Sequence, residues 1–290
     1  MGRRKRQEGE TQRHRERREE GKKEGGEERG RPGRASRNVR GVIKSRSGGG
    51  TIPNVGKLLV GTSGYSYKEW KGNFYPEKLP DKEMLPFYAK QFSTVEINHS
   101  FYKMPTESAL MNWAKSVPEG FRFALKANQQ ITHIRRLRDC ESTLKRFLEV
   151  ASILKDGDHL GPVLVQLPPT FKFDKPLLEE FLAMKPAAFH FAFEVRHPSW
   201  YLEETYEVLR KYETALCLSE TDKQTPPEVI TAPFAYARLR LEDYTPKQIA
   251  AWRERFDKWL AQGIDVYVYF KHEDGGKAPA YAHQLLGLKP

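Results

Sequence analysis

The sequence predicts an α/β protein built as a (β/α)8 TIM-like barrel, and two observations support this prediction. Eight short apolar runs follow one another from residue 57 onward, and almost every run ends in a polar or charged residue. Stretches of helical character separate most of these runs, which is the alternation that a closed parallel barrel requires. The expected strands cover 57–63, 95–98, 122–126, 162–166, 191–196, 215–220, 234–240 and 265–271.

The expected helices follow from amphipathic spacing and from residues that begin or end a helix. In 141–154, Leu144, Phe147 and Leu148 recur at helical spacing. Ser199 has the character of an N-cap for a helix that ends near Tyr212. The segment after the sixth strand, 221–233, contains three prolines and leaves little room for a helix. The other expected helices cover 81–92, 106–116, 175–184, 246–261 and 278–286.

An open doubly wound sheet is the main alternative, because it also alternates strands and helices. Its strands are covered on both faces and usually read as continuous apolar runs. Here several strands place polar residues at alternate positions near their ends. The chain also lacks the GxGxxG and GxxxxGKS turns with which such sheets bind nucleotides. We therefore favour the closed barrel.

The charge pattern divides the chain into two expected regions, a disordered tail at 1–55 and a single barrel domain at 56–290. Residues 1–50 hold 17 Lys and Arg against 8 Asp and Glu, a surplus of +9, whereas the remainder holds 32 against 30, a surplus of +2. A segment with so few apolar residues cannot bury enough surface to offset its ordering entropy. Since the barrel is close to neutral, its overall charge gives no argument for a nucleic-acid partner. Such a partner is left open through the basic tail and the cations at the strand ends.

Cysteine usage and hydropathy favour a cytoplasmic protein. Cys140 and Cys217 form neither a CxxC metal pair nor a disulfide framework. No apolar stretch approaches the roughly 20 residues needed to cross a bilayer, so we expect no membrane contact. The tail lacks the apolar core of a secretory signal, and its many Glu residues argue against a transit peptide.

The polar face of each strand is expected to point into the barrel. Side chains alternate across a strand, so residues two apart share a face. The opposite choice would bury charges beneath the helices, which costs several kcal/mol for each unpaired charge. The sequence does not fix the register of the first and sixth strands. The residues expected to converge at the carboxyl ends are Glu96, Asn98, Lys126, Gln166, Glu194, Arg196, Arg238 and Lys271.

The balance of charge in this expected cluster favours an anionic ligand. Four cations stand against two carboxylates, Glu96 and Glu194. Arg presents a planar fork that matches phosphate or carboxylate, and Lys acts as a base when its pKa is lowered. Barrels often bind phosphate beside strands seven and eight, where Gly275-Gly276-Lys277 precedes a helix, although a plain turn explains these glycines equally well. An ion-pair network that merely fills the barrel is the alternative interpretation of the whole cluster.

A metal site is a weaker hypothesis. Imidazole and carboxylate are suitable ligands for several transition metals. The nearby cations oppose a metal ion, however, so no cofactor is expected and a divalent metal is only a minor alternative. Its ligands would come from Glu194, His197, His99, His133 and His272.

Two classical hydrolytic arrangements are also weak. Glu96 and Glu194 have the chemistry of a glycosidase pair, but the surrounding cations would keep both ionised and remove the acid. Ser63 and Ser100 have no evident base that would activate a nucleophile. The aromatic loop 65–75 would suit stacking on a sugar or base, and packing as a lid explains it at least as well.

Several distinct short motifs follow one another along the strand ends. They are GTSGYSY at 61–67 with Trp70 and FYP at 74–76, VEIN at 95–98 with SFY at 100–102, GFRFALKA at 120–127, TH at 132–133, LGPVLVQLPP at 160–169 and EVRHPSW at 194–200. In these motifs the chain resembles the family called domain of unknown function 72, the YecE-like proteins, across about 57–290. The resemblance implies a TIM-like barrel and does not imply a reaction.

Two loops depart from the pattern of that family. The family tends to follow strand seven with His-Gly, whereas this chain has Arg240-Leu241-Glu242. It also tends to carry Asn and Asp after the last strand, where Lys271-His272-Glu273-Asp274 stands here. The extra cations would suit a variant ligand.

Our preferred hypothesis is an enzyme that acts on a small anionic substrate, phosphorylated or carboxylated, at the carboxyl face of the barrel. The alternative is a nucleic-acid-binding or DNA-processing barrel, and a third hypothesis is a ligand sensor without catalysis. The reaction and the oligomeric state stay open. The expected catalytic residues are Glu96, Lys126 and Glu194, and the expected binding residues are Tyr65, Asn98, Tyr102, His133, Gln166, Arg196, His197, Arg238 and Lys271.

Overall fold

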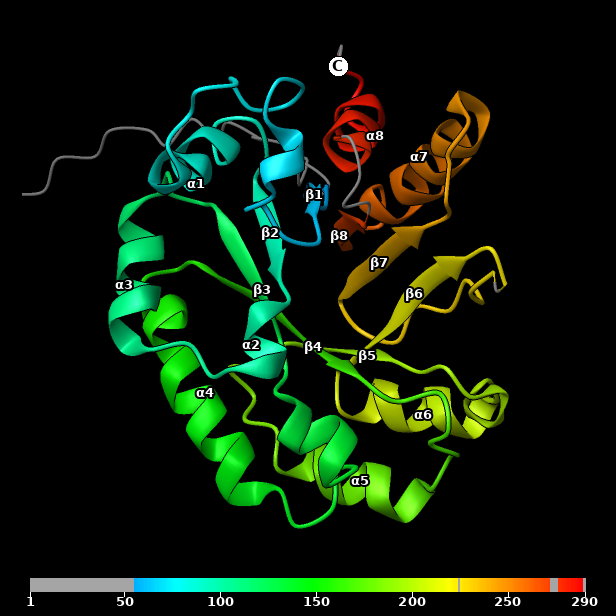
Figure 1. The fold of residues 1–290 in the computed structure, drawn as a ribbon. Coiled ribbons are helices and arrows are strands. Elements are labelled where there is room, and N and C mark those ends of the chain that lie inside the picture. Colours follow the sequence, from blue (N-terminus) through cyan, green and yellow to red (C-terminus); the bar gives the residue numbers. More distant parts are fainter. Residues whose placement is uncertain (1–54, 224, 272–275, 289–290) are drawn as a thin grey trace, which may run out of the picture. The chain divides into compact units, whose positions relative to one another are not determined.

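The computed structural model describes residues 55–223, 225–271 and 276–288 (Figure 1). Eight parallel strands follow one another in the order β1-β8-β7-β6-β5-β4-β3-β2. The two ends of this sheet meet through a parallel bridge between Ser63 and Glu96, beside which the Gly64 N–H donates to the Glu96 carbonyl oxygen at 2.8 Å. The predicted TIM-like barrel is therefore confirmed. The predicted tail lies outside the described residues.

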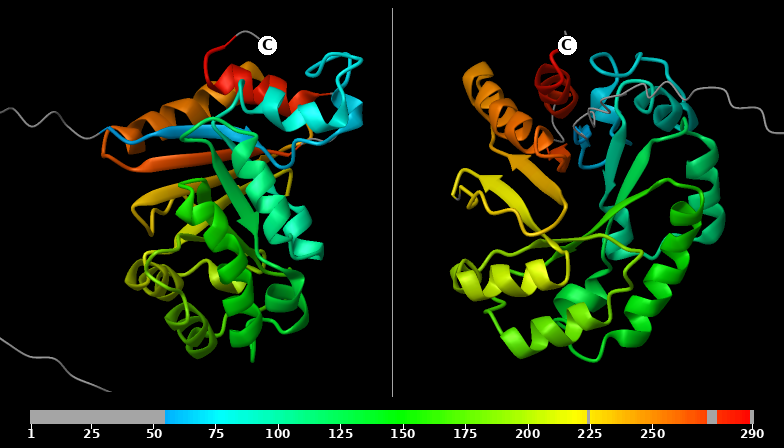
Figure 2. Two further views of the ribbon diagram at one scale, coloured as in Figure 1. Left: turned by 90° about the vertical axis from the view of Figure 1, so that its left-hand side faces the viewer. Right: turned by 180° about the vertical axis from the view of Figure 1, so that it is seen from behind.

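Helices surround the strands on the outside, as both views of Figure 2 show. The strands are β1 Leu58–Thr62, β2 Thr94–Ile97, β3 Arg122–Lys126, β4 Leu160–Gln166, β5 Phe191–Glu194, β6 Ala215–Thr221, β7 Phe234–Arg240 and β8 Asp265–Phe270. The α-helices are α1 Met84–Tyr88, α2 His99–Tyr102, α3 Glu107–Lys115, α4 Glu141–Asp156, α5 Lys175–Ala183, α6 Glu203–Lys211, α7 Pro246–Leu260 and α8 Lys277–Leu285. None of these described helices is long and apolar enough to cross a membrane.

Local signals in the sequence account for most helix ends. A capping box formed by Thr245 and Gln248 begins α7, with Pro246 in the first turn where its missing N–H costs nothing. Ser199 is not the N-cap of α6, so that expectation is wrong. Its hydroxyl accepts the Phe173 N–H at 2.8 Å instead, and Ser199 lies within a short 3-10 turn, Pro198–Trp200, that precedes the helix. Between β6 and β7 the described residues form no helix, as the prolines predict.

Two apolar layers pack against the sheet. The larger lies between the strands and the helices, and the smaller fills the barrel interior with side chains that alternate along the strands. The inner layer includes Ala124, Leu164, Ala192, Tyr236 and Tyr269. This is the inward register that the polar pattern predicts. The residue two positions after each of the first four of these also faces inward, toward the carboxyl end of its strand, and there it is polar.

The β1–β2 seam that closes the barrel depends on a glycine. A Cβ added to Gly61 would lie 2.0 Å from the Thr94 carbonyl oxygen and 2.8 Å from the Tyr88 hydroxyl. The Tyr88 hydroxyl accepts the Thr62 N–H at 2.8 Å and donates to Thr94 O at 3.1 Å. The Tyr88 side chain thus links β1 and β2, which pair with each other only through the Ser63–Glu96 bridge among the described residues.

We predict that Gly61→Ala lowers the free energy of unfolding by about 1–3 kcal/mol or more, because the added methyl overpacks the seam. Urea unfolding followed by fluorescence measures the loss. Gly157→Ala is the matched control, since its nearest neighbour would be 3.5 Å away, and it should change stability by no more than about 0.5 kcal/mol. Equal effects of the two substitutions would contradict the role assigned to the seam.

Candidate active site at the carboxyl ends of the strands

The site is organised around the side chain of Arg238, which β7 directs into the barrel and which is 2% exposed. Its Nη1 donates to Glu194 Oε2 and, at 3.1 Å, to Gln166 Oε1. Its Nη2 donates to Glu96 Oε1 at 2.8 Å. One guanidinium therefore links β2, β4, β5 and β7 across the interior of the barrel.

Glu96 is fully buried and is surrounded by donors. Besides Arg238, Oε1 accepts the Ser63 hydroxyl and, at 3.3 Å, Asn98 Nδ2, while Oε2 accepts the Tyr236 hydroxyl at 2.7 Å. Burial alone would raise the pKa of Glu96. The Arg238 charge and the hydrogen bonds from Ser63 and Tyr236 outweigh burial and hold the pKa below its usual range.

Glu194 ends β5 and contacts three arginines. Arg196 Nε and Arg240 Nη2 both donate to its Oε1 at 3.0 Å, and Arg238 occupies its Oε2. Burial opposes ionisation here too, but the three cations hold the pKa of Glu194 well below its usual range. We call Glu96, Glu194, Arg196, Arg238 and Arg240 the ion cluster.

The ion cluster has more donors than the described residues can satisfy. The Nε atoms of Arg238 and Arg240 are buried and make no hydrogen bond to any described residue. The terminal nitrogens of Arg196, a side chain that is 33% exposed, likewise contact no described acceptor, because Nε alone binds Glu194. Glu96 and Glu194 thus already accept several hydrogen bonds each. The arginines still have nitrogens that bind no described acceptor, and the cluster keeps a net positive charge.

Lys126 is the last residue of β3 and lies beside the ion cluster, but it takes no part in the ion pairs of that cluster. Its Nζ lies 4.1 Å from the centre of the Phe101 ring, and it makes no hydrogen bond or ion pair with any described residue. Burial, followed by the charge of Arg238, lowers the pKa of Lys126 to about 8. An amine with such a pKa exchanges a proton readily near neutral pH.

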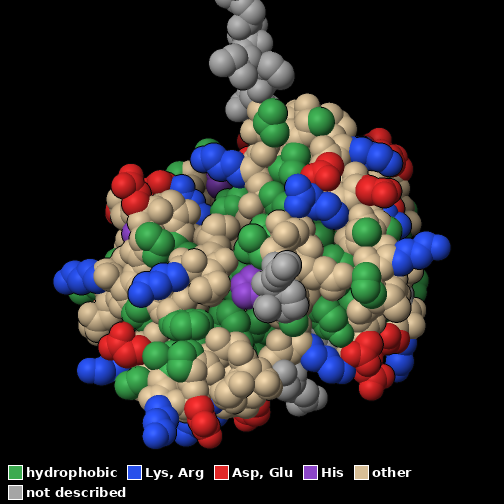
Figure 3. All heavy atoms as spheres, turned by 90° about the horizontal axis from the view of Figure 1, so that it is seen from above, with side chains coloured by type: hydrophobic (Ala, Val, Ile, Leu, Met, Phe, Trp, Pro, Cys, Tyr) green, Lys and Arg blue, Asp and Glu red, His purple; other side chains and the backbone are tan. Residues whose placement is uncertain are grey.

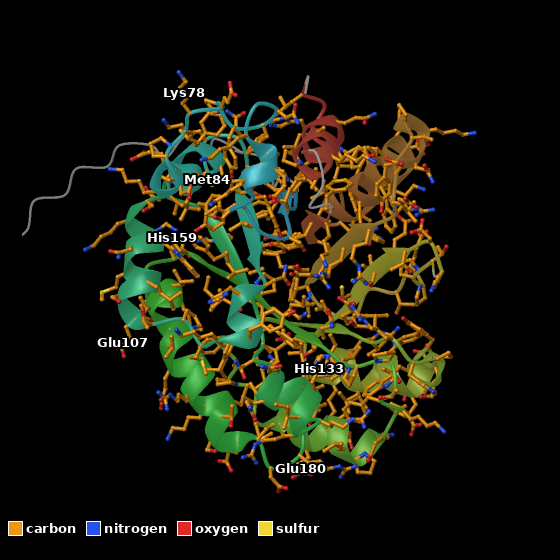
Figure 4. All side chains as sticks on the ribbon, in the orientation of Figure 1. Lys78, Met84, Glu107, His133, His159 and Glu180 are labelled. Atoms are coloured by element: carbon orange, nitrogen blue, oxygen red, sulfur yellow. The ribbon has the colours of Figure 1, made fainter. Side chains whose placement is uncertain are left out.

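Two histidines lie near the rim of the same face. His133, labelled in Figure 4, sits on the helical turn after β3, with Nδ1 2.9 Å from Thr132 Oγ1 and its ring edge-on to Phe101. Burial first, and then the charges of Lys126 and Arg196, lower its pKa. His197 Nδ1 accepts the Ser199 N–H at 3.2 Å. Both rings are half-buried.

The remaining expected residues lie in different surroundings. Gln166 is buried against Arg238. Tyr65 is half-buried, and its carbonyl oxygen accepts the Tyr75 hydroxyl at 2.5 Å, which places it in the packed aromatic loop. Tyr102 is 69% exposed and Lys271 is also exposed. Contacts with Arg238 or with its two glutamates thus join Glu96, Asn98, Gln166, Glu194 and Arg196 directly.

Sequence reasoning missed four residues of this network, namely Ser63, Tyr236, Arg240 and Ser219. Tyr236 and Arg240 share the inward face of β7 with Arg238, so strand alternation carried a signal for them. Ser63, which has no evident partner in the sequence, in fact donates to Glu96. Ser219 accepts Arg240 Nη2. No sequence signal was available for Ser63 and Ser219, because the registers of β1 and β6 were open.

An open pocket of about 450 Å³ adjoins the ion cluster. It lies between the loops that follow β5 and β6. Its lining residues include Arg196, Pro198, Tyr201, Lys223 and Pro226. A molecule in this pocket would meet the exposed part of the Arg196 guanidinium.

No three His, Cys, Asp or Glu side chains within 55–223, 225–271 and 276–288 are placed so that they could hold a metal ion. Of the residues expected for metal or phosphate, His272 and Gly275 lie outside the described residues. Gly276 precedes α8 with a φ of +74°.

Known proteins similar to this chain point to one family. Residues 59–289 match the family described as protein of unknown function DUF72. The UPF0759 protein YecE of Escherichia coli is 34% identical over 118 residues, so the match spans 40% of this chain and less than half, 43%, of that protein. The UPF0759 protein YunF of Bacillus subtilis is 23% identical over 268 residues, with 80% of this chain and 94% of YunF covered.

Solved structures extend this similarity to the fold. A DUF72 family protein from Thermotoga maritima aligns with a TM-score of 0.69 and 26% identity, covering 80% of this chain and 98% of that chain. A DUF72 family protein from Enterococcus faecalis aligns with a TM-score of 0.67 and 21% identity, covering 81% and 98%. The second match concerns the fold alone.

We predict that Arg238→Met lowers the free energy of unfolding by about 3–5 kcal/mol, because Glu96 loses its cation while it stays buried. The double variant Glu96→Gln with Arg238→Met should recover much of the loss, since the uncompensated charge is gone. Arg138→Met removes an exposed ion pair with Asp174 and should cost less than about 1 kcal/mol. Urea titrations at pH 7 measure all three. A double variant no more stable than Arg238→Met would contradict the charge argument.

We also predict a specific loss of stability in acid. The pKa values of Glu96 and Glu194 are depressed in the folded state, so their contribution is fully present above the unfolded pKa of about 4.3 and is lost as the pH falls through the folded values. The unfolding free energy should therefore drop less steeply below pH 5 in Glu96→Gln than in the parent protein. Glu107→Gln, at an exposed site on α3, should follow the parent curve. Parallel curves for all three proteins would refute the assignment.

Proposed function

Since the chain belongs to the DUF72 family of TIM-like barrel proteins, we propose that it is an enzyme acting on a small anionic molecule, phosphorylated or carboxylated, at the carboxyl ends of the barrel strands. The proposal places the whole activity in the barrel domain. It also assigns the protein to the cytoplasm, in line with two buried free cysteines, Cys140 and Cys217.

The observation that carries the proposal is a surplus of positive charge around two carboxylates whose acceptor sites are already occupied. Lys126, Arg196, Arg238 and Arg240 stand against Glu96 and Glu194 at one end of the barrel. Both glutamates are held ionised and already accept several hydrogen bonds. A bound anion would balance the two remaining positive charges and would accept donors that no described residue accepts.

The cations divide into two groups by exposure. Arg238 is buried and its terminal nitrogens are occupied, so it positions the two glutamates rather than contacting a substrate. Arg196 is 33% exposed on the pocket side, and Lys126 is half-buried with a free amine. These two residues are the ones that we assign to direct contact with the anion.

The glutamates are poorly suited to donate protons, because the arginines hold both of them ionised. We therefore assign to Glu96 and Glu194 the task of fixing the arginines. Lys126 is the better acid or base, since its pKa of about 8 lies near the working pH. His133, whose pKa is lowered by burial, would accept a proton beside it.

The described surface offers less support to the nucleic-acid alternative. On the face shown in Figure 3, the basic and acidic side chains of the described residues lie intermingled. Figure 4 likewise shows exposed acidic side chains, among them Glu107 and Glu180, on the outer helices. The basic tail lies outside the described residues, so that alternative stays a prediction.

We predict that a phosphorylated or carboxylated metabolite raises the melting temperature of the parent protein. The rise should be lost or strongly reduced in Arg196→Ala and Lys126→Ala, because each removes a cation that faces the ligand. Arg210→Ala, on the exposed end of α6, is the control and should respond like the parent. Differential scanning fluorimetry with a panel of sugar phosphates and oxo acids tests this. The proposal fails if no compound stabilises the protein, or if all variants respond alike.

A further inference from the structure

We propose that Lys126 is a nucleophile that forms an imine with a carbonyl group of the anionic substrate. The inference rests on the proposed function and narrows it to aldehydes and ketones that carry a phosphate or a carboxylate. Three features of the structure support it: an amine with no hydrogen bond or ion pair to a described residue, a cation (Arg196) close enough to act on that amine, and burial that favours its neutral form.

The side chain of Lys126 is held in place, but its amine makes no hydrogen bond or ion pair with a described residue. Ser100 Oγ donates to the Lys126 carbonyl oxygen at 2.7 Å, which fixes the backbone at the end of β3. The side chain then passes over the Phe101 ring, with Nζ 4.1 Å from the ring centre. Two buried carboxylates lie nearby, but Glu194 is paired with arginines and Glu96 with Arg238 and hydroxyls, so neither forms an ion pair with the amine.

Lys185 provides an internal comparison. Burial lowers its pKa as well, but its Nζ donates to the Phe189 carbonyl oxygen at 3.2 Å on the outer side of the barrel. Lys185 thus has a hydrogen-bond acceptor for its amine. Lys126 has none among the described residues, although it is half-buried at the carboxyl end of β3.

The surroundings of Lys126 favour the uncharged amine, chiefly through burial. Burial is the largest cause and Arg238 the next, and together they bring the pKa of Lys126 to about 8 against the opposing effect of the two glutamates. A lysine beside other cations in a desolvated site is a recognised form of activated amine nucleophile. The charged and titratable groups that act on Lys126 or are acted on by it are Arg238, Glu96, Glu194, Arg196 and His133.

The proposed step needs no oxidant or reductant. The lone pair of neutral Nζ attacks the carbonyl carbon, the C=O π bond breaks, and the carbonyl oxygen takes a proton to give a carbinolamine. Loss of the hydroxyl as water, after a second proton transfer, leaves a protonated imine. Amine, carbonyl compound and one proton thus give iminium and water. Arg196 would hold the phosphate or carboxylate of the same molecule.

Reductive trapping tests the inference on the full chain. The protein is incubated with dihydroxyacetone phosphate or pyruvate and sodium cyanoborohydride, which reduces the iminium to a stable secondary amine, and the adduct is mapped by peptide mass spectrometry. Dihydroxyacetone and hydroxyacetone serve as matched compounds without the anion. Lys126→Arg keeps the charge but cannot form an imine, and Lys103→Arg changes an exposed lysine at the end of α2.

The expected result with at least one of the two anionic compounds is one dominant adduct on Lys126. At pH 7.5 its labelling rate should exceed that of Lys103 by about tenfold or more, because the pKa of Lys126 is lowered to about 8 and its amine is therefore neutral more often than at the usual lysine value. The adduct should vanish in Lys126→Arg, persist in Lys103→Arg and weaken about tenfold with the compounds that lack an anion. Its rate should rise with pH through a midpoint near 8.

Fluorimetry on the same samples separates this inference from the proposed function. Stabilisation by an anionic compound without an adduct on Lys126, or with adducts spread evenly over exposed lysines, overturns the imine and leaves the anion site standing. An adduct pattern that is unchanged in Lys126→Arg also overturns the imine and leaves the anion site standing. Absence of stabilisation by every anionic compound in the panel overturns both proposals. Urea unfolding of Lys126→Arg establishes that the variant is folded.

Discussion

A single buried guanidinium holds the functional end of this barrel together. Arg238, on β7, binds residues of three other strands and contacts two carboxylates that are themselves fully buried. Removing charges from water is costly, and only complete pairing with good geometry offsets that cost. The inner polar residues are therefore constrained as a group: each carboxylate must face Arg238, and the hydroxyls of Ser63 and Tyr236 must fill the remaining acceptor sites on Glu96.

This constraint separates the residues that stabilise the barrel from those that are available for chemistry. Glu96, Glu194 and Arg238 satisfy one another beneath the mouth, while Arg196 and Lys126 keep donors that face outward. A network that only filled the barrel would leave no donors in excess. The excess here includes the terminal nitrogens of Arg196 and the amine of Lys126, and it is the reason to look for an anion at this end.

Family membership and local departures from the family give complementary information. The match over 59–289 extends across the barrel, and the resemblance includes the VEIN and EVRHPSW motifs that carry Glu96 and Glu194. Arg240 stands where the family resemblance would place a different loop, yet its Nη2 binds Glu194 and Ser219. Arg240 therefore adds a cation to the ion cluster itself and not to a remote surface.

The sequence by itself determined the elements and the inward register of six strands, because helix and strand periodicity are local properties of consecutive residues. It also placed Glu96, Lys126, Glu194, Arg196 and Arg238 at one end, since parallel strands bring their carboxyl ends together. Tertiary structure alone decided which of these charges pair. Arg238 is 142 residues from Glu96 and 44 residues from Glu194, so no local pattern could join them. It also decided that Arg238 is enclosed while Lys126 stays unpaired, because burial and pairing depend on how the closed barrel stacks one layer of side chains upon the next.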